Sequence, residues 1–469
     1  MLSKKKAIFW SIINKFSPQL INFIVTIILS RIIEPYDFGN LSIVLIFIGF
    51  SNLIIEFGFG ETLIQKKTEN NSSSFHSVFW FQLGISILLF IFFYYLAPLI
   101  SDYFKSVQLI NLIRVSSLNL MIGSLYAMPY TILIKNLEFH KISLVSILST
   151  FVSSIFAIYF VYNGFEIYSI IYRQLIAHFV TSILFFSISK WKPRFVFNLN
   201  EIKDLLTTSI HFISIRFINI GYDNFINLIF ASHLGQVRMG FYNRAEAFKK
   251  VGSNSIDGAL QLVSFSIFSK SKTDSNRIKD FKKLKKYIIS ISFLSVLVLY
   301  FFAKEVIIFT ISEKWIDSIS ILKSFTLYAS ILPLYNYYIT YIKTTDNFKI
   351  ATKIEFLNKS LLMLSSLTIF FTDSIEITIY LLGTLVLLSV LFLDRYVSDT
   401  KFKYSSLLNI LGMIAVFVCY YFVEKYIYYL NIFFDLPIRI LILIFLISLY
   451  FLFVERKIFT EIKSHFKWM

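Results

Sequence analysis

Long apolar segments follow one another along the whole chain, and they constrain its fold more than any other feature. The hydrocarbon core of a bilayer is about 30 Å thick, so a spanning helix needs roughly 20 mainly apolar residues. Segments of this kind lie near residues 8–33, 41–65, 75–100, 109–137, 143–165, 166–189, 205–234, 239–268, 287–310, 319–343, 353–372, 374–397, 407–430 and 434–458. The sequence therefore predicts an all-α polytopic membrane protein with about fourteen transmembrane helices and no soluble domain.

Composition excludes several other classes of protein. The chain is 57% apolar and 16% charged, whereas soluble domains average about 45–50% and about 25%. This balance excludes a cytosolic enzyme, a disordered protein and a secreted disulfide scaffold. The single cysteine, Cys419, excludes an internal disulfide and a cysteine-based metal cluster. We expect no cofactor and no metal site.

The charge distribution indicates topology rather than a nucleic-acid partner. The formal net charge is +17, and basic residues of membrane proteins collect in cytoplasmic loops. If the N-terminus is cytoplasmic, most basic residues outside the apolar segments fall on that side, including a cluster at 279–286 that would face anionic lipid headgroups. We therefore expect cytoplasmic N- and C-termini and no nucleic acid.

The first apolar segment carries a continuous polar stripe. Its polar residues recur every three or four positions on one helix face, and they are Ser11, Lys15, Gln19, Asn22, Thr26 and Ser30. Polar groups at this depth are costly unless they face a bundle interior or a water-filled cavity. Two explanations remain open, because such a stripe lines a hydrated cavity or forms hydrogen bonds between helices.

The seventh and eighth segments repeat this pattern. In the seventh, the polar residues on one face are Arg216, Asn219, Asp223 and Asn227. In the eighth they are Asn243, Glu246, Lys250, Ser253, Asp257 and Gln261, and the spacing of Glu246 and Lys250 suits an ion pair within the helix. Arg173 in the sixth segment and Lys323 in the tenth also lie away from the segment ends. The excess of basic over acidic residues favours an anionic substrate.

Two connections along the chain indicate an internal repeat. The first apolar segment ends Ser30-Arg-Ile-Ile-Glu-Pro-Tyr-Asp-Phe-Gly39, and the seventh ends Ser232-His-Leu-Gly-Gln-Val-Arg-Met-Gly240. Six segments separate them, so both halves would enter the membrane in the same direction. Parallel repeats of this kind are common in transporters, with the substrate site between the halves.

The chain also carries motifs that resemble those of a known family. They are Leu29-Ser-Arg-Ile-Ile-Glu-Pro-Tyr-Asp-Phe-Gly39, Phe59-Gly-Glu-Thr-Leu-Ile-Gln65, Ser77-Val-Phe-Trp80, Leu234-Gly-Gln-Val-Arg-Met-Gly-Phe-Tyr-Asn-Arg-Ala245 and Glu313-Lys-Trp315. Together they resemble the Wzx-type polysaccharide-lipid flippases of the MOP exporter superfamily, which serve O-antigen, capsule and lipopolysaccharide biosynthesis. Ser312 stands where the family pattern usually has glycine.

The resemblance implies an architecture and a substrate. It implies two six-helix lobes around a central cationic cavity, an N-terminal lobe at 1–204 and a C-terminal lobe at 205–405, with two peripheral helices and a cytoplasmic tail at 406–469. The implied substrate is a polyprenyl-pyrophosphate-linked oligosaccharide, moved across a bacterial inner membrane from the cytoplasmic to the outer leaflet. A polysaccharide polymerase and a chain-length regulator are the implied protein partners, beside membrane lipids.

We assign the cationic residues of the predicted cavity to the charged headgroup, because guanidinium groups bind phosphate in a bidentate manner. These residues are Arg31, Arg173, Arg216, Arg244 and Lys250, of which Arg31 and Arg244 match the family motifs. Arg244 lies off the face that holds Glu246 and Lys250, so one of the two assignments in this segment conflicts with an ideal helix. Coupling to a proton or sodium ion is left open at Glu56, Asp257 and Glu355.

Two other functions remain as alternatives. A drug or cation exporter of the same superfamily should have a cavity dominated by acids and aromatic rings, whereas this one is mostly basic. An O-antigen polymerase or ligase embedded in the membrane needs a sizeable outward-facing loop, and the predicted outer loops are short. No catalytic triad, nucleotide-binding loop or metal motif is present in the sequence, so we expect a transporter and not an enzyme.

Overall fold

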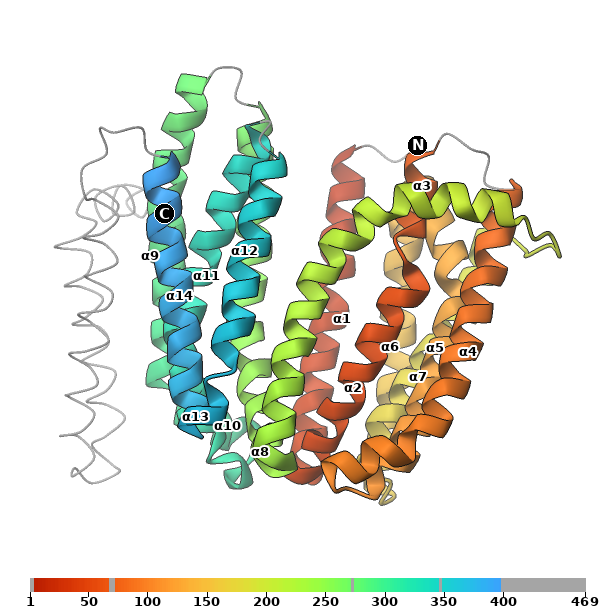
Figure 1. Ribbon diagram of the computed structural model, residues 1–469, viewed down its shortest axis with the longest axis horizontal. Coiled ribbons are helices and arrows are strands. Elements are labelled where there is room, and N and C mark those ends of the chain that lie inside the picture. The colour runs from red at the N-terminus through yellow and green to blue at the C-terminus, as the bar shows by residue number, and fades with distance from the viewer. Residues whose placement is uncertain (1–3, 67–71, 271–273, 346–347, 398–469) are drawn as a thin grey trace, which may run out of the picture. The chain divides into compact units, whose positions relative to one another are not determined.

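The computed structural model describes residues 4–66, 72–270, 274–345 and 348–397, and every regular element within these residues is a helix (Figure 1). The helices are α1 (Lys4–Ile32), α2 (Pro35–Glu56), α3 (Phe59–Gln65), α4 (Ser73–Phe104), α5 (Gln108–Lys135), α6 (Phe139–Tyr162), α7 (Tyr168–Ser189), α8 (Leu199–Lys270), α9 (Asp274–Phe301), α10 (Ala303–Ile311), the short 3-10 helix η1 (Glu313–Trp315), α11 (Ser318–Thr344), α12 (Phe348–Ser366), α13 (Ile369–Thr372) and α14 (Ile375–Val397). The predicted spans at 407–430 and 434–458, and with them the predicted region 406–469, lie outside the described residues.

Each of the first twelve predicted spans has a helical counterpart, but several are divided differently. The second is interrupted at Phe57 and Gly58, both in the left-handed region with φ of 40° and 74°, and continues as α3. The seventh and eighth belong to one helical run, α8, which bends at Gly235, where φ is 72° and ψ is 172°. Only glycine adopts that conformation without strain, so this residue fixes where the chain turns between the two spans.

Seven helical segments of the described chain are long and apolar enough to cross a membrane, with α2 and α3 taken together as one segment. The others are α4, α5, α6, α7, α12 with α13, and α14. Within α1, the described stretch Ser17–Ile32 is a shorter apolar helix.

The chain divides into two compact units. The first contains the chain up to Asn243 together with Thr310–Trp315, and the second contains Arg244–Phe309 and the chain from Ile316 onward. In the first unit α4 packs on α5, α1 on α6, and α7 on both α5 and α6. In the second, α11 packs on α9, α12 and α14. The predicted lobes at 1–204 and 205–405 differ from these units in definition, and they remain predictions.

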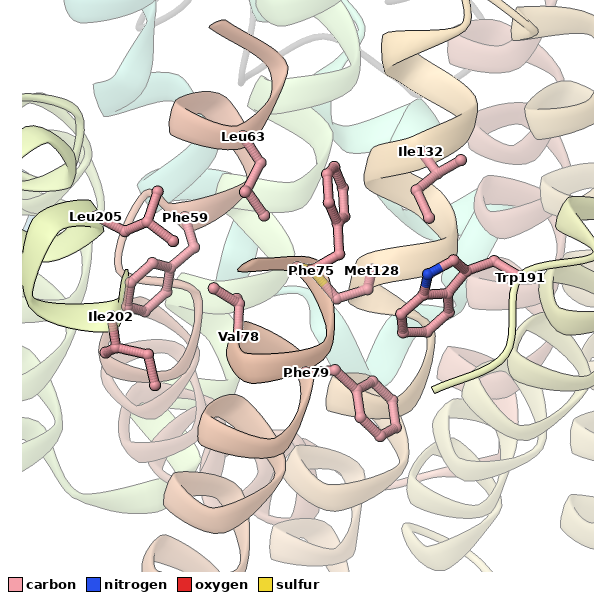
Figure 2. Close-up of a cluster of buried hydrophobic side chains, with 10 residues drawn as sticks. All are labelled: Phe59, Leu63, Phe75, Val78, Phe79, Met128, Ile132, Trp191, Ile202 and Leu205. Atoms are coloured by element: carbon pink, nitrogen blue, oxygen red, sulfur yellow. The ribbon is translucent and has the colours of Figure 1, made fainter. Parts of the chain in front are cut away.

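A buried apolar cluster in the first unit joins short and long helices (Figure 2). Its members come from α3, α4, α5, the connection after α7 and the start of α8, and they are Phe59, Leu63, Phe75, Val78, Phe79, Met128, Ile132, Trp191, Ile202 and Leu205. Each of these side chains is at most 6% exposed. The first turns of α8 cross over α3 (Figure 1), and this cluster holds them there.

Candidate functional site

The guanidinium of Arg216 on α8 lies between two carboxylates. Its Nη1 donates to Glu56 at the end of α2, and its Nη2 lies 2.6 Å from Oε1 of Glu61 on α3. The side chains of Arg216, Glu56 and Glu61 are 40%, 55% and 34% exposed, so they can exchange partners without unpacking a core. We call these three residues the Arg216 trio, whose formal charges sum to −1.

The interruption between α2 and α3 brings the two carboxylates together. Glu56 is the last residue of α2, and the left-handed Phe57 and Gly58 redirect the chain before Glu61 enters the first turn of α3. In a continuous helix, residues five positions apart point in different directions. Arg216 and Glu56 were both candidate site residues, whereas Glu61 was not recognised although it stands inside the motif Phe59-Gly-Glu-Thr-Leu-Ile-Gln65.

A second cation of the predicted set meets the polar stripe of α1. Arg173 on α7 donates from Nη2 to Oδ1 of Asn22 on α1. Asn22 is exposed, while Gln19 and Thr26 are half-buried on the same helix. Lys15 lies within α1, but its side chain is outside the described set. The structure thus brings together one amide and one guanidinium that are 151 residues apart in the chain.

The remaining polar residues of the seventh predicted span lie after Arg216 along α8. Asn219 and Asp223 are exposed and Asn227 is half-buried. Next to Asp223, the amide of Asn224 approaches α2 so closely that a Cβ on Gly49 would stand 2.8 Å from Nδ2. A glycine therefore permits α2 and this polar part of α8 to touch.

In the second unit, Glu246 on α8 lies between two lysines. Its Oε1 is 3.0 Å from Nζ of Lys250 and 3.8 Å from Nζ of Lys249. The side chain of Lys250 is 45% exposed, whereas that of Lys249 is 9% exposed and lies over the rings of Phe325 and Tyr328, at 4.5 and 5.0 Å from their centres. Lys250 is thus the accessible member of the pair, and Lys249 was not a candidate from the sequence.

Arg244 has a different environment from Lys250 in the same helix. Arg244 is only 8% exposed. The sequence posed the question which of these two cations faces an open space, and the exposed fractions favour Lys250.

The three acids considered for ion coupling all have partners. Glu56 belongs to the Arg216 trio. Oδ2 of Asp257 accepts hydrogen bonds from Gln261 at 3.0 Å and from Asn336 on α11 at 2.7 Å. Glu355 on α12 forms an ion pair with Lys343 on α11, at 2.9 Å. In the chain that the structure describes, no group of three or more His, Cys, Asp or Glu side chains could hold a metal ion.

Arg31 lies apart from the Arg216 trio, in a junction between motif segments. Its Nε donates to the backbone oxygen of Thr310 at 2.7 Å. Nearby, Lys314 lies 3.3 Å from Glu34, and Nε1 of Trp315 donates to the backbone oxygen of Ser30 at 2.8 Å. We call this region the motif junction (residues 30–40, 236–241 and 310–315).

Trp315 is the centre of the motif junction. Its side chain is fully buried, and its ring packs edge-on against Phe38 of α2 and Phe241 of α8, with centroids 5.4 and 6.1 Å away. Three of the segments that carry the family resemblance therefore meet at one place, although nearly 300 residues separate the first from the last. The sequence did not indicate that these segments contact one another, because they lie far apart along the chain.

Two glycines cross reciprocally within the motif junction. A Cβ on Gly39 would overlap the backbone oxygen of Gln236, and a Cβ on Gly240 would overlap the backbone oxygen of Pro35. Each glycine closes one copy of the repeat recognised in the sequence, and each lies against the middle of the other copy. The shared glycine was visible in the sequence, but its contact with the opposite copy was not.

Residues 28–320 match the model of a family described as polysaccharide biosynthesis protein. The chain belongs to this family. Among its curated relatives are the teichuronic acid biosynthesis protein TuaB of Bacillus subtilis (strain 168), 26% identical over 278 residues, and the lipopolysaccharide biosynthesis protein WzxC of Escherichia coli (strain K12), 24% identical over 306 residues. These matches cover 58% and 63% of this chain, and 57% and 61% of the relatives, which is less than two thirds of their length.

Solved structures show the fold that this member of the polysaccharide biosynthesis protein family adopts. The lipid II flippase MurJ in an inward closed conformation matches with a TM-score of 0.73 and 16% identity, over 94% of this chain and 98% of that one. An inward-facing multidrug resistance MATE family transporter of the MOP superfamily matches with a TM-score of 0.64 and 16% identity, over 83% and 98%. The chain is therefore a multi-pass helical membrane protein of this fold.

Proposed function

We propose that the chain is a flippase for polyprenyl-pyrophosphate-linked oligosaccharide units, which it moves from the cytoplasmic to the outer leaflet of a bacterial inner membrane by alternating access. The observation that carries the proposal is the exposed Arg216 between Glu56 and Glu61, on a helix whose polar face continues through Asn219 and Asp223. Family membership and the shared fold support it.

The energetic problem of this transport is the headgroup. Polar and charged groups lose their water in hydrocarbon, at a cost of several kcal/mol for each unpaired group. A hydrated path with cationic side chains removes this cost, while the polyprenyl tail stays in the lipid. Exposed amides such as Asn22 and Asn219 would donate to sugar hydroxyls along that path.

In this mechanism the carboxylates of the Arg216 trio hold a place for the substrate. Glu56 and Glu61 present oxygen atoms to both terminal nitrogens of Arg216, as a pyrophosphate would. They keep the guanidinium oriented when no substrate is bound. In the same way, Asn22 orients Arg173 and Glu246 orients Lys250. On binding, each of these cations would exchange its partner within the protein for a phosphate oxygen.

The motif junction closes the outer end of the path in this proposal. Its segments follow the ends of predicted spans that leave the cytoplasm, so they belong to the outer side. Release of the substrate outward requires these contacts to separate, including the bond from Arg31 to Thr310. Arg31 would then reach the substrate only in the outward-open state. Arg244, which is buried here, would likewise require a rearrangement.

The finer architectural predictions belong to the same proposal. They are fourteen spans, two six-helix lobes at 1–204 and 205–405 around a central cavity, two peripheral helices at 406–469 and both termini in the cytoplasm. A polymerase and a chain-length regulator that take over the exported unit are the proposed partners. Helical counterparts to the first twelve predicted spans support this architecture.

An exporter of cationic drugs is the second candidate, because one observation favours it. The Arg216 trio has a formal charge of −1, which would attract a cation, and the fold is shared with a multidrug resistance transporter. A polymerase or ligase is less well supported. The described connections on the predicted outer side are short, such as Lys105 to Val107 between α4 and α5, and leave little room for glycan chemistry.

The decisive experiment replaces Arg216 in a strain whose surface glycan depends on this chain. Arg216→Ala should reduce surface glycan at least tenfold while the protein remains in the membrane, and Arg216→Lys should retain an intermediate level because it keeps charge but loses the bidentate fork. Arg114→Ala is the matched control, since the guanidinium of Arg114 lies over the ring of Tyr94 and donates to the backbone oxygen of that residue. If Arg216→Ala leaves surface glycan unchanged but makes the strain more sensitive to cationic drugs, the result would instead support the exporter.

A further inference from the structure

The connection between α7 and α8, residues 190–198 (the linker), has a fixed conformation without being helical. Nε1 of Trp80 donates to the backbone oxygen of Arg194 at 2.8 Å, and the backbone N–H of Arg194 donates to Nδ1 of His76 at 3.1 Å. The backbone N–H of Asn198 donates to Oγ of Ser77 at 2.9 Å. The first turns of α4 thus satisfy backbone groups of the linker that would otherwise need water.

Two ring stacks complete this attachment. Trp191 lies over His76 with centroids 5.2 Å apart and 14° between the planes, and Phe195 lies over Trp80 at 4.7 Å and 19°. Trp191 is buried in the cluster of Figure 2. The linker is therefore anchored at one end by a buried ring, and Phe195 is held by a ring beneath it.

The outer surface of the linker combines apolar and basic side chains. Phe195 is 92% exposed, Phe197 is 52% exposed, and Leu199 at the start of α8 is 59% exposed. The basic residues of this surface are all exposed, and they are Lys190, Lys192, Arg194 and Lys203. The acids nearby are Glu201, which accepts a hydrogen bond from Ser73, and the exposed Asp204.

The first turns of α8 continue the same surface. Their inner face packs on α3 through Ile202 and Leu205 (Figure 2), and Oγ of Ser209 lies 2.8 Å from Oγ1 of Thr62. On the same helix Leu199 is exposed, and Ile210 is 52% exposed. At 100° per residue, Leu199 and Ile210 lie on one flank of this helix, between the packed face and the exposed polar face that holds Asn200 and Asp204. This is the distribution of a helix that lies along an interface.

We propose that the linker and the first turns of α8 form an anchor in the headgroup region of an anionic leaflet. Phe195, Phe197 and Leu199 would enter the boundary between headgroups and acyl chains, where apolar side chains leave water. The basic residues would contact anionic headgroups, which attract such clusters at the cytoplasmic face. Irregular backbone is tolerated there because α4 supplies its hydrogen bonds.

A lipid surface fits better than a protein partner for two reasons. The exposed apolar side chains of Phe195, Phe197 and Leu199 follow one another in a strip that also carries exposed lysines and an arginine, a combination that suits the boundary of an anionic leaflet. The strip is also positively charged, and the distribution of basic residues along the sequence places positively charged connections on the cytoplasmic side. The inference does not depend on which substrate the protein transports.

The position of Phe195 can be measured directly. In a Cys419→Ser background, Phe195→Cys carries an environment-sensitive fluorophore, and the full chain is placed in nanodiscs of phosphatidylglycerol and phosphatidylcholine. We expect blue-shifted emission and strong quenching by lipids brominated near the glycerol backbone. Solvent-like emission without quenching overturns the proposal, and so does shielding that appears only in native membranes, which would indicate a protein partner.

The electrostatic part is tested with a matched pair of triple variants. Lys190→Gln, Lys192→Gln and Arg194→Gln together should lower the enrichment of spin-labelled phosphatidylglycerol around the probe at least threefold. Lys105→Gln, Arg114→Gln and Lys304→Gln together remove the same charge at or near the predicted outer side and should leave that enrichment unchanged. Raising the salt concentration should reproduce the effect of the first triple variant. Equal enrichment in both triple variants rejects the anionic headgroup as the ligand.

Discussion

Lys285 on α9 carries a charge in a largely apolar environment. Its side chain is 9% exposed and lies 5.3 Å from the ring centre of Tyr338, and its Nζ is 2.6 Å from Oδ1 of Asp394 on α14. Tyr338 also donates a hydrogen bond to Asp394. Asp394 thus balances a buried cation and fixes a buried phenol, which links α9, α11 and α14.

Asp394→Ala should therefore destabilise the protein by about 3 kcal/mol, because removing one partner of a buried pair leaves the other charge uncompensated. The measurement is the midpoint of thermal unfolding of the purified protein in detergent, which should fall by several degrees. The double variant Lys285→Met with Asp394→Leu should recover most of the loss, since a buried pair is often replaceable by apolar residues of similar volume.

The more exposed ion pair between Lys343 and Glu355 provides the comparison for the buried pair of Lys285 and Asp394. Its side chains are 29% and 20% exposed, so water can solvate the remaining charge. Glu355→Ala should cost about 1 kcal/mol and shift the unfolding midpoint less than Asp394→Ala. Equal shifts in both variants would show that burial of Lys285 is not the cause.

Between elements, the reciprocal glycines set how closely α2 and α8 approach. Gly39→Ala and Gly240→Ala each place a Cβ where the opposite backbone oxygen lies, and a backbone cannot yield as a flexible side chain does. We expect each variant to loosen the motif junction and to reduce surface glycan severalfold. In a Cys419→Ser background, Ser30→Cys, which is fully buried here, should then react faster with a membrane-impermeant maleimide.

Gly84→Ala is the control for this prediction. Gly84 lies in α4, and a Cβ there meets nothing within 4 Å, so the variant should be neutral or slightly stabilising because alanine favours the helix. Maleimide labelling of Ser30→Cys should stay slow in that background. If labelling rises equally in the Gly84→Ala and Gly39→Ala variants, the close crossing is not what protects the junction.

For the whole molecule, the sequence predicted what depends on local pattern. Apolar length located the helices, and spacing placed Asn22 and Arg216 on polar faces that remain exposed. The break at Phe57 was not predictable, because a non-glycine residue in the left-handed region carries no pattern signal. The sharing of Arg216 by Glu56 and Glu61 was missed for the same reason, because this break brings the two carboxylates together.

Long-range contacts were also beyond the sequence. Arg31 was assigned to a cavity because it is basic and matches a family motif, yet it donates here to the backbone oxygen of Thr310, 279 residues away. Every residue has a backbone oxygen, so no pattern of residue types can indicate which one accepts this hydrogen bond. The exposed apolar surface of the linker was likewise not recognised from the sequence.

The driving force is a property of the whole molecule, and the charge of the substrate predicts it. With the cytoplasm negative, outward movement of an anion is favourable by about 2.3 kcal/mol per charge for each 100 mV. We expect proteoliposomes to move a fluorescent pyrophosphate-linked oligosaccharide when a potassium gradient with valinomycin sets the potential, and to stop when the potential is clamped at zero. Asp257→Asn should retain this transport, because Asp257 is held by Asn336 and Gln261 and has no role in a potential-driven cycle. Transport driven by a pH gradient alone, and lost in Asp257→Asn, would show instead that a proton is coupled through α8 and α11.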